Sequence, residues 1–267
     1  MYPIISGNEL LKIDVAIKDE LAEVEVSLDL GITNTKIKLS KNGFYVNKKL
    51  VKIGKIRDDK SCYVIIDGKL QKVQFFSDEA NVLYKLISTK GKPLLQISGT
   101  SMHKKLFVDR IERERLTGKV LDSGTGLGYT SIVVAKTCDE VITIEVDKNV
   151  VEIAKLNPYS QELFKNKKIK LIKGDLVEKI KKFKDEELDN IILDAGTPRS
   201  SGDFFSLMNY QEVYRVLKKG RKVYHYLPKH HEKRGRDFGE EVIKRMSKVG
   251  FKLIERNIED SYAILKK

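Results

Sequence analysis

From about residue 99 onwards, short apolar runs alternate with stretches in which apolar residues recur every three or four positions. The runs predict strands at 119–122, 140–144, 169–173, 189–194 and 222–227. The stretches predict helices at 104–116, 129–136, 148–156, 177–183, 205–217 and 238–249. Two more runs, at 252–258 and 261–265, predict a final antiparallel pair. Such alternation requires right-handed crossovers, so we expect an α/β fold, doubly wound, with a mostly parallel seven-stranded sheet.

The first 98 residues show a different pattern, in which apolar and polar residues partly alternate and turn signals are frequent. Asn42-Gly43 and Asp67-Gly68 each predict a β-hairpin, because these pairs favour the tight turns that join antiparallel strands. Short amphipathic helices are expected at 9–18 and 79–88. We therefore predict a β-rich accessory domain at 1–98 and an α/β domain at 99–267.

Composition narrows the class of protein. The chain has 267 residues, of which 41% are hydrophobic and 33% charged, as is typical of a globular protein. No apolar run approaches the ~20 residues that a membrane-spanning helix needs. The two cysteines, Cys62 and Cys138, are far apart and have no metal-binding spacing. We expect a cytoplasmic protein that binds neither a membrane nor a metal ion.

The net charge indicates a class of binding partner. The chain carries 51 Lys and Arg against 38 Asp and Glu, which leaves a formal charge of +13. A field of this sign attracts polyanions, so nucleic acid is the first partner to consider. An excess of surface lysine, as in thermophilic proteins, explains the charge equally well.

The segment from Val120 to Ser131 reads as a buried strand, a tight turn with three glycines and the start of a helix. Glycines allow a ligand to approach the backbone closely. A dinucleotide fingerprint would need its third glycine where Tyr129 stands, and no Gly-Lys-Ser/Thr follows to make a P-loop. Ligands of open α/β sheets bind beyond the carboxyl ends of the strands, so the other strand ends matter too.

Acidic residues stand at three of those other strand ends: Glu145, Asp175 and Asp194. Glu145 ends the second strand, where a carboxylate can accept hydrogen bonds from ribose hydroxyls. Asp175 follows the third strand and is also a good N-cap for the helix after it. Together with Asp122, these acids predict a pocket for a nucleoside-containing ligand.

Asp122-Ser-Gly-Thr-Gly-Leu-Gly128 resembles the first motif of class I S-adenosylmethionine-dependent methyltransferases, which have a Rossmann-like fold. The chain from Ser98-Gly-Thr-Ser-Met-His103 onwards resembles archaeal predicted methyltransferases with a spermidine-synthase-like core. The resemblance implies S-adenosyl-L-methionine as cofactor, with its amino group near Asp122, its ribose at Glu145 and its adenine at Asp175. The full set of implied cofactor-binding residues is Asp122, Gly124, Thr125, Gly126, Gly128, Glu145 and Asp175.

The acceptor is expected at the loop after the fourth strand, where Asp194 and Thr197 are the catalytic candidates. A carboxylate there can orient an amine and help its proton leave. The resembling archaeal sequences carry Asp-Pro-Pro-Arg at this point, whereas this chain has Asp194-Ala-Gly-Thr-Pro-Arg199. Spermidine synthases also place an acid here for a substrate amine, so Asp194 alone does not decide the acceptor.

Three residues are expected to contact the substrate: His103, Arg199 and Phe204. Arg199 can hold a phosphate and Phe204 can stack on a base, although Phe204 can equally pack against the sheet. Residues 218–236 carry eight Lys or Arg and three His, a composition that fits contact with nucleic-acid phosphates or a solvated surface.

Three functions are consistent with these features. The first is N-methylation of RNA, either rRNA or tRNA, by an S-adenosylmethionine-dependent methyltransferase. The second is transfer of a methyl or aminopropyl group to a small amine, as a spermidine-synthase-like core suggests. The third is an RNA-binding module that has lost turnover through the altered motif after Asp194.

Overall fold

The computed structural model describes residues 2–79, 81–102, 105–194, 202–227 and 237–267. The chain forms two compact units. The first consists of Met1–His103 with Glu152–Gln161, and the second of Lys104–Val151 with Glu162–Lys267. Within the described residues, no helix is both long and apolar enough to cross a membrane.

The second unit is built on a seven-stranded mixed sheet with the order β14-β13-β12-β15-β16-β18-β17. The first five strands in this order run parallel, and β18 runs antiparallel to both of its neighbours. All seven lie where strands were predicted. Their bounds are β12 Lys119–Ser123, β13 Glu140–Glu145, β14 Ile169–Lys173, β15 Leu188–Leu193, β16 Leu217–Tyr226, β17 Lys252–Asn257 and β18 Tyr262–Lys266.

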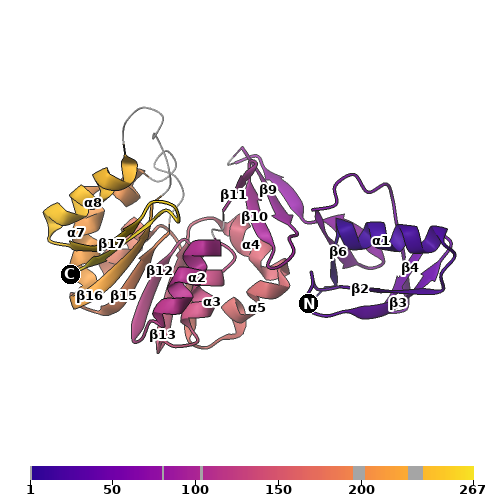
Figure 1. Cartoon of the computed structure of the whole chain (residues 1–267), viewed down its shortest axis with the longest axis horizontal. Coiled ribbons are helices and arrows are strands. Elements are labelled where there is room, and N and C mark those ends of the chain that lie inside the picture. Colours follow the sequence, from indigo (N-terminus) through magenta and orange to yellow (C-terminus); the bar gives the residue numbers. More distant parts are fainter. Residues whose placement is uncertain (1, 80, 103–104, 195–201, 228–236) are drawn as a thin grey trace. The chain divides into compact units, whose positions relative to one another are not determined.

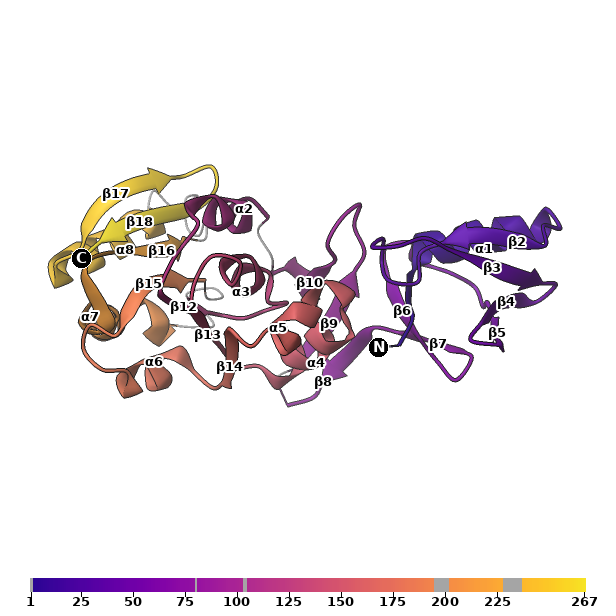
Figure 2. The same cartoon turned by 90° about the horizontal axis from the view of Figure 1, so that it is seen from below.

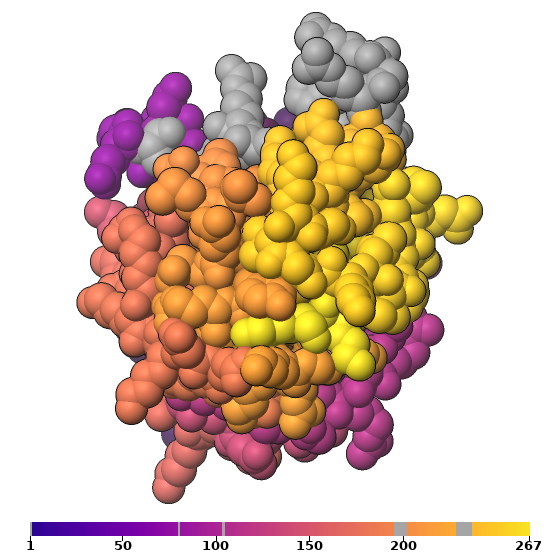
Figure 3. Space-filling view, turned by 90° about the vertical axis from the view of Figure 1, so that its left-hand side faces the viewer, coloured from indigo at the N-terminus to yellow at the C-terminus, as the bar shows by residue number. Residues whose placement is uncertain are grey.

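Helices cover both faces of this sheet. Along the sheet, the chain moves from β12 through β13 to β14, and it moves in the opposite direction from β15 to β16. Because such crossovers are right-handed, the helices that connect the two sets of strands lie on opposite faces. Figure 1 shows α2 and α3 on one side and α7 and α8 on the other, and Figure 3 shows α7 beside α8. The helices are α2 Lys105–Glu114, α3 Tyr129–Val134, α4 Lys148–Leu156, α5 Gln161–Lys165, α6 Leu176–Lys179, α7 Leu207–Val216 and α8 Phe238–Val249, with 3-10 turns η1 Pro158–Ser160, η2 Ile180–Lys182 and η3 Gly202–Phe205.

The core of the second unit lies between the sheet and these helices. Leu121 and Ile191 on the central strands are fully buried, as are Tyr210 on α7 and Val242 on α8. Because these central strands are buried on both faces, they could be recognised from apolar runs and did not need an alternation of apolar and polar residues. The strand order reverses between β12 and β15, so the carboxyl ends of these two strands mark the edge where a ligand site is expected.

The first unit contains three small antiparallel sheets, ordered β2-β3-β4-β5, β1-β6-β7 and β11-β10-β9-β8. Helix α1, Gly7–Lys18, packs against the first of these sheets (Figure 2). The strands are β1 Ile4–Ser6, β2 Glu23–Val26, β3 Thr35–Ser40, β4 Gly43–Val46, β5 Lys49–Lys52, β6 Cys62–Ile66, β7 Lys69–Lys72, β8 Gln74–Ser77, β9 Val82–Ile87, β10 Leu94–Ile97 and β11 Thr100–Ser101.

Both predicted hairpins are confirmed, and one predicted helix is wrong. The β3–β4 hairpin has Lys41 and Asn42 in its turn and Gly43 as the first residue of β4. Asp67-Gly68 joins β6 to β7 with φ angles of 50° and 74°. The helix expected at 9–18 is α1. The one expected at 79–88 is instead the strand β9, because pairing with β8 and β10 and the burial of Tyr84 outweigh the local spacing.

The boundary between the units lies beyond the expected one. Residue 98 is in the turn of the β10–β11 hairpin, where Ser98 and Gly99 have φ angles of 44° and 84°. These two residues therefore close a hairpin within the first unit. The first unit continues past them and also includes the end of α4 and the η1 turn.

Candidate functional site

The glycine loop follows β12 directly. Gly124, Gly126 and Gly128 have φ angles of 76°, 55° and 79°, a conformation that residues with a side chain rarely adopt. A Cβ on Gly128 would also lie 2.8 Å from the side chain of Leu163. The loop therefore requires glycine for its own conformation, and it presents backbone without side chains to a ligand.

Asp122 lies beneath this loop and is 1% exposed. Its Oδ2 accepts hydrogen bonds from the hydroxyls of Ser131 on α3 and Thr143 on β13. Its Oδ1 is buried and has no hydrogen-bond partner among the described residues. Burial raises the pKa of Asp122 to about 7. A buried carboxylate oxygen without a partner favours a cationic ligand group, which would offset the cost of its desolvation.

Two of the implied cofactor-binding residues hold the loop in place. Glu145 is 7% exposed, and its Oε2 accepts a hydrogen bond from the Gly126 N–H at 2.9 Å. Its Oε1 accepts one from the Asp147 N–H at 3.0 Å. Burial raises the pKa of Glu145, and these backbone donors oppose the rise. Thr125 is buried, with its hydroxyl 2.7 Å from that of Thr143. Each carboxylate oxygen of Glu145 keeps acceptor capacity for a ligand hydroxyl.

Asp175 caps α6. Its Oδ1 accepts a hydrogen bond from the Val177 N–H at 2.9 Å, so the N-cap role is confirmed. The residue is exposed at the carboxyl end of β14. Binding of an adenine by Asp175 stays a prediction, and the cap leaves its other oxygen for such a contact.

Asp194 follows β15 and is half-buried. Its backbone N–H donates a hydrogen bond to Ser123 Oγ at 3.0 Å, which joins the ends of β15 and β12. Tyr226, at the end of β16, is 9% exposed, and burial together with the charge of Asp194 raises the pKa of its phenol. Tyr226 was not predicted as a site residue from the sequence, although its place at a strand end was an available signal.

Phe204 lies in the core. It is 5% exposed, and its ring meets the ring of Phe205 edge-on at 5.0 Å and that of His225 at 5.9 Å. The structure thus shows the packing alternative for Phe204 and not an exposed ring that could stack on a base, because the apolar turn η3 folds onto α7 and β16. His225 is fully buried between Tyr210 Oη and the Tyr226 carbonyl, and burial lowers its pKa to about 4.

Several predicted site residues lie outside the described residues: Thr197, Arg199 and His103, together with most of the basic stretch after Leu227. Within the described part of the chain, no group of three or more His, Cys, Asp or Glu is arranged to hold a metal ion. The described site therefore consists of carboxylates, hydroxyls and backbone at the strand ends.

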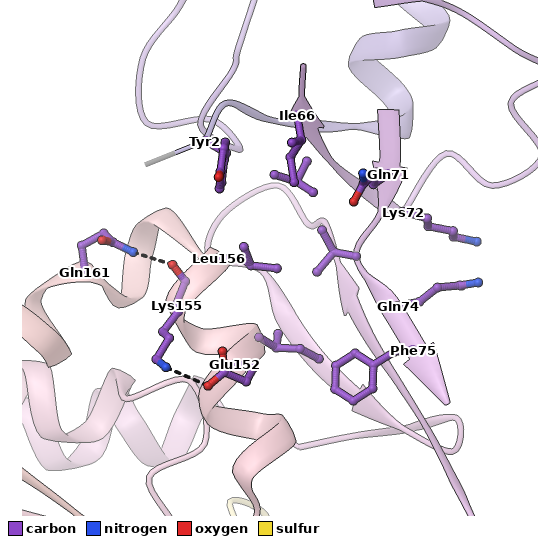
Figure 4. A pocket seen from close by; sticks show the side chains of 13 residues that line it. Tyr2, Ile66, Gln71, Lys72, Gln74, Phe75, Glu152, Lys155, Leu156 and Gln161 are labelled. Atoms are coloured by element: carbon purple, nitrogen blue, oxygen red, sulfur yellow. Dashed lines mark hydrogen bonds and ion pairs between the residues drawn. The ribbon is translucent and has the colours of Figure 1, made fainter. Parts of the chain in front are cut away.

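The first unit has a separate hollow of about 500 Å³ (Figure 4). Its walls include the apolar side chains of Val73, Phe75 and Leu156. Lys155 lies on its rim and forms an ion pair with Glu152 at 2.7 Å. None of the residues expected to bind cofactor or substrate lines this hollow. It contributes no chemistry to the strand-end site.

Comparison with known proteins gives a family and a fold. The family model described as the spermine/spermidine synthase domain matches residues 119–255. An uncharacterized protein of Methanocaldococcus jannaschii is 36% identical over 266 residues, covering 91% of this chain and 88% of that protein. Spermidine synthase from Thermotoga maritima has the same fold, with a TM-score of 0.56 at 18% identity over 89% of this chain and 76% of its own. A probable spermidine synthase from Corynebacterium glutamicum matches with a TM-score of 0.54 at 15% identity over 72% and 78%.

Proposed function

Because the chain belongs to the spermine/spermidine synthase domain family, we propose that it is a transferase acting on an S-adenosyl sulfonium donor and an amine acceptor. Aminopropyl transfer is the reaction that family membership favours. The donor supplies an electrophilic carbon next to its sulfonium sulfur, and an amine nitrogen displaces the thioether from that carbon. Side chains of this protein would bind the donor, orient the amine and accept its proton.

The observation that carries the proposal is the buried, unpartnered Oδ1 of Asp122 beneath the glycine loop. An S-adenosyl donor carries an ammonium group at one end and a ribose diol near the other. A contact between this ammonium and Asp122 would be charge-assisted, and such hydrogen bonds are about twice as strong as neutral ones. Glu145, which keeps acceptor capacity on both oxygens, suits the ribose hydroxyls. The residues present thus fit the donor.

Asp194 is the residue proposed to act on the acceptor. An amine attacks as the neutral base, and the nitrogen must lose a proton once the new C–N bond has formed. A carboxylate at the end of β15 can orient the amine and accept that proton. The hydrogen bond from its backbone to Ser123 fixes Asp194 relative to the strand that leads into the donor loop.

The acidic character of the described strand ends supports a small cationic acceptor. Asp122, Glu145, Asp175 and Asp194 all stand there, and Tyr226 adds a phenol. Opposite charge in a cleft raises the local concentration of a cationic substrate. Amines of the diamine and polyamine class match this field.

The test compares two donors. The protein is incubated with a diamine and either S-adenosylmethionine or its decarboxylated form, and the thioether product is identified by mass spectrometry. Aminopropyl transfer yields 5′-methylthioadenosine and methyl transfer yields S-adenosylhomocysteine. We expect methylthioadenosine, and an Asp194→Asn variant that makes much less of it. Folded protein that releases neither thioether with a diamine or with RNA would contradict the proposal.

Methylation of an RNA nitrogen is the second candidate. It is favoured by the Asp122-Ser-Gly-Thr-Gly126 spacing, which resembles methyltransferases, and by the net charge of +13. Its test is transfer of a labelled methyl group from S-adenosylmethionine to deproteinised rRNA or tRNA. Label in RNA, with no aminopropyl product from the decarboxylated donor, would select this candidate over the first.

A further inference from the structure

Charge is unevenly divided within the first unit. Residues 1–34 carry two Lys against seven Asp or Glu, whereas residues 35–72 carry eleven Lys or Arg against three Asp or Glu. The second segment alone therefore has a formal charge of +8 out of the +13 of the whole chain. It includes β3, β4 and β5 and also β6 and β7 of another sheet. Six of its eleven basic residues lie on β3, β5 and the two turns that flank β4: Lys36, Lys38, Lys41, Lys48, Lys49 and Lys52.

The sheet β2-β3-β4-β5 has one covered face and one open face. Ile37, Phe44 and Val51 point to the covered face, where they form a buried cluster with Leu10 and Ile13 of α1. Residues that alternate with these point the other way. The open face of β4 presents Tyr45, which is 42% exposed and pairs with Leu50 across the strand.

Four lysines surround Tyr45. Lys38 precedes Leu39, the partner of Phe44, so Lys38 stands beside Tyr45 on the open face. Lys52 is paired with Gly43 on the other flanking strand. Lys41 and Lys48 lie in the turns before and after β4. All four are exposed, and none forms an ion pair with a carboxylate in the described part of the chain.

Some lysines elsewhere are paired with acids. Lys136 pairs with Glu112 and Lys170 with Glu140, both at 2.6 Å. Interspersed pairs of this kind are what a generally lysine-rich, thermophile-like surface produces. The four lysines around the exposed Tyr45 ring form no ion pair with any described residue, and Glu23, which stands opposite Lys38 on β2, pairs with Lys36 instead.

We infer that this open face, defined by Lys38, Lys41, Tyr45, Lys48 and Lys52, binds single-stranded RNA. The lysines would contact successive phosphates while a base stacks on Tyr45, the combination by which single strands are bound without a fixed sequence. The exposed tyrosine among the lysines favours an unpaired strand over a duplex or an anionic membrane, because only unpaired bases offer a free face for stacking. This proposal does not depend on which alkyl group the enzyme transfers, because RNA binding at the open face requires no turnover.

The test is fluorescence anisotropy of a labelled 12-nucleotide oligouridylate titrated with the full chain. Each phosphate contact with a single strand contributes about −0.7 to the slope of log K against log salt, so four contacts make binding about 50-fold weaker at 200 mM than at 50 mM NaCl. A fourfold Lys→Gln variant should lose most of this slope. Tyr45→Ser should weaken binding about tenfold and leave the slope unchanged, because stacking is worth about 1–3 kcal/mol per base.

A matched control removes the same charge from the second unit by changing Lys165, Lys167, Lys182 and Lys184 to Gln, all exposed. It should bind the RNA almost as tightly as the unchanged chain, and thermal melting establishes that each variant is folded. The inference is overturned if the control loses as much affinity as the variant of the open face, if Tyr45→Ser has no effect, or if duplex DNA or phosphatidylserine vesicles bind as tightly as the oligouridylate. Absence of RNA binding at 50 mM NaCl also overturns it.

Discussion

Replacing Asp122 with Asn should stabilise the protein in a pH-dependent way. The Asp122 carboxyl ionises near 3.8 in an unfolded chain, and burial raises its pKa to about 7 in the folded protein. Between these values the folded state keeps a proton that the unfolded state has lost. The wild-type free energy of unfolding therefore falls as the pH rises from about 4 to 7, and this contribution is constant above that range.

The magnitude follows from the two pKa values. Each pKa unit corresponds to about 1.4 kcal/mol, so ionising the buried Asp122 costs at most about 4 kcal/mol. Asn cannot ionise and has nearly the same shape. Relative to wild type, Asp122→Asn should gain about 2.5 kcal/mol more stability at pH 8 than at pH 5, because about 1.5 kcal/mol of the cost is already present at pH 5.

Urea denaturation of both proteins at pH 5 and pH 8 measures this difference. Asp175→Asn is the matched control, since Asp175 is exposed and Asn caps a helix as well as Asp does. Its effect should stay within about 0.5 kcal/mol at both pH values. Equal effects of Asp122→Asn at pH 5 and pH 8 would refute the view that Asp122 is ionised at a cost. The same variant should bind an S-adenosyl donor more weakly by calorimetry, because it lacks the charge that we propose faces the ammonium group.

Three further substitutions test other parts of the site. Gly128→Ala should destabilise the protein by about 1–3 kcal/mol in urea, because it combines a φ of 79° with a contact at 2.8 Å to Leu163. Glu145→Gln should weaken donor binding by roughly tenfold in calorimetry, and unchanged affinity would remove Glu145 from the ribose site. Tyr226→Phe should lower kcat and leave the KM for the donor unchanged if the phenol acts with Asp194 on the acceptor; a rise in donor KM alone would place Tyr226 at the donor instead.

The α/β domain could be predicted closely because its central strands, β12, β13 and β15, are buried on both faces. Apolar runs such as Val141–Ile144 of β13 and Ile191–Leu193 of β15 have little competing interpretation, and turn residues separate them from the helices. β9 was predicted wrongly as a helix since its run is short and only pairing with β8 and β10 selects the strand. Short segments whose partners lie elsewhere in the chain carry too little local information.

The candidate site also has features that the sequence could predict and features that it could not. The positions of Asp122 and Glu145 could be predicted because the fold places strand-end residues at one edge of the sheet. The hydroxyl partners of Asp122 could not, because Ser131 and Thr143 reach it from α3 and β13 through tertiary packing. Phe204 was ambiguous in the sequence, since an aromatic residue after a strand suits both a core and a binding surface, and burial alone separates the two.

The hydrogen bond from Gly126 to Glu145 has a consequence for the speed of donor binding. A loop with three glycines in seven residues would fluctuate among many backbone states if it were free, and a ligand would have to wait for the right one. Here the bond from Gly126, with the bonds from Gly124 and Thr125 to the Ile144 carbonyl, holds the loop before any donor arrives. Association should then be a single exponential whose rate rises linearly with donor concentration. Gln at position 145 should slow association as well as weaken it, because a neutral amide holds the loop less firmly than a carboxylate.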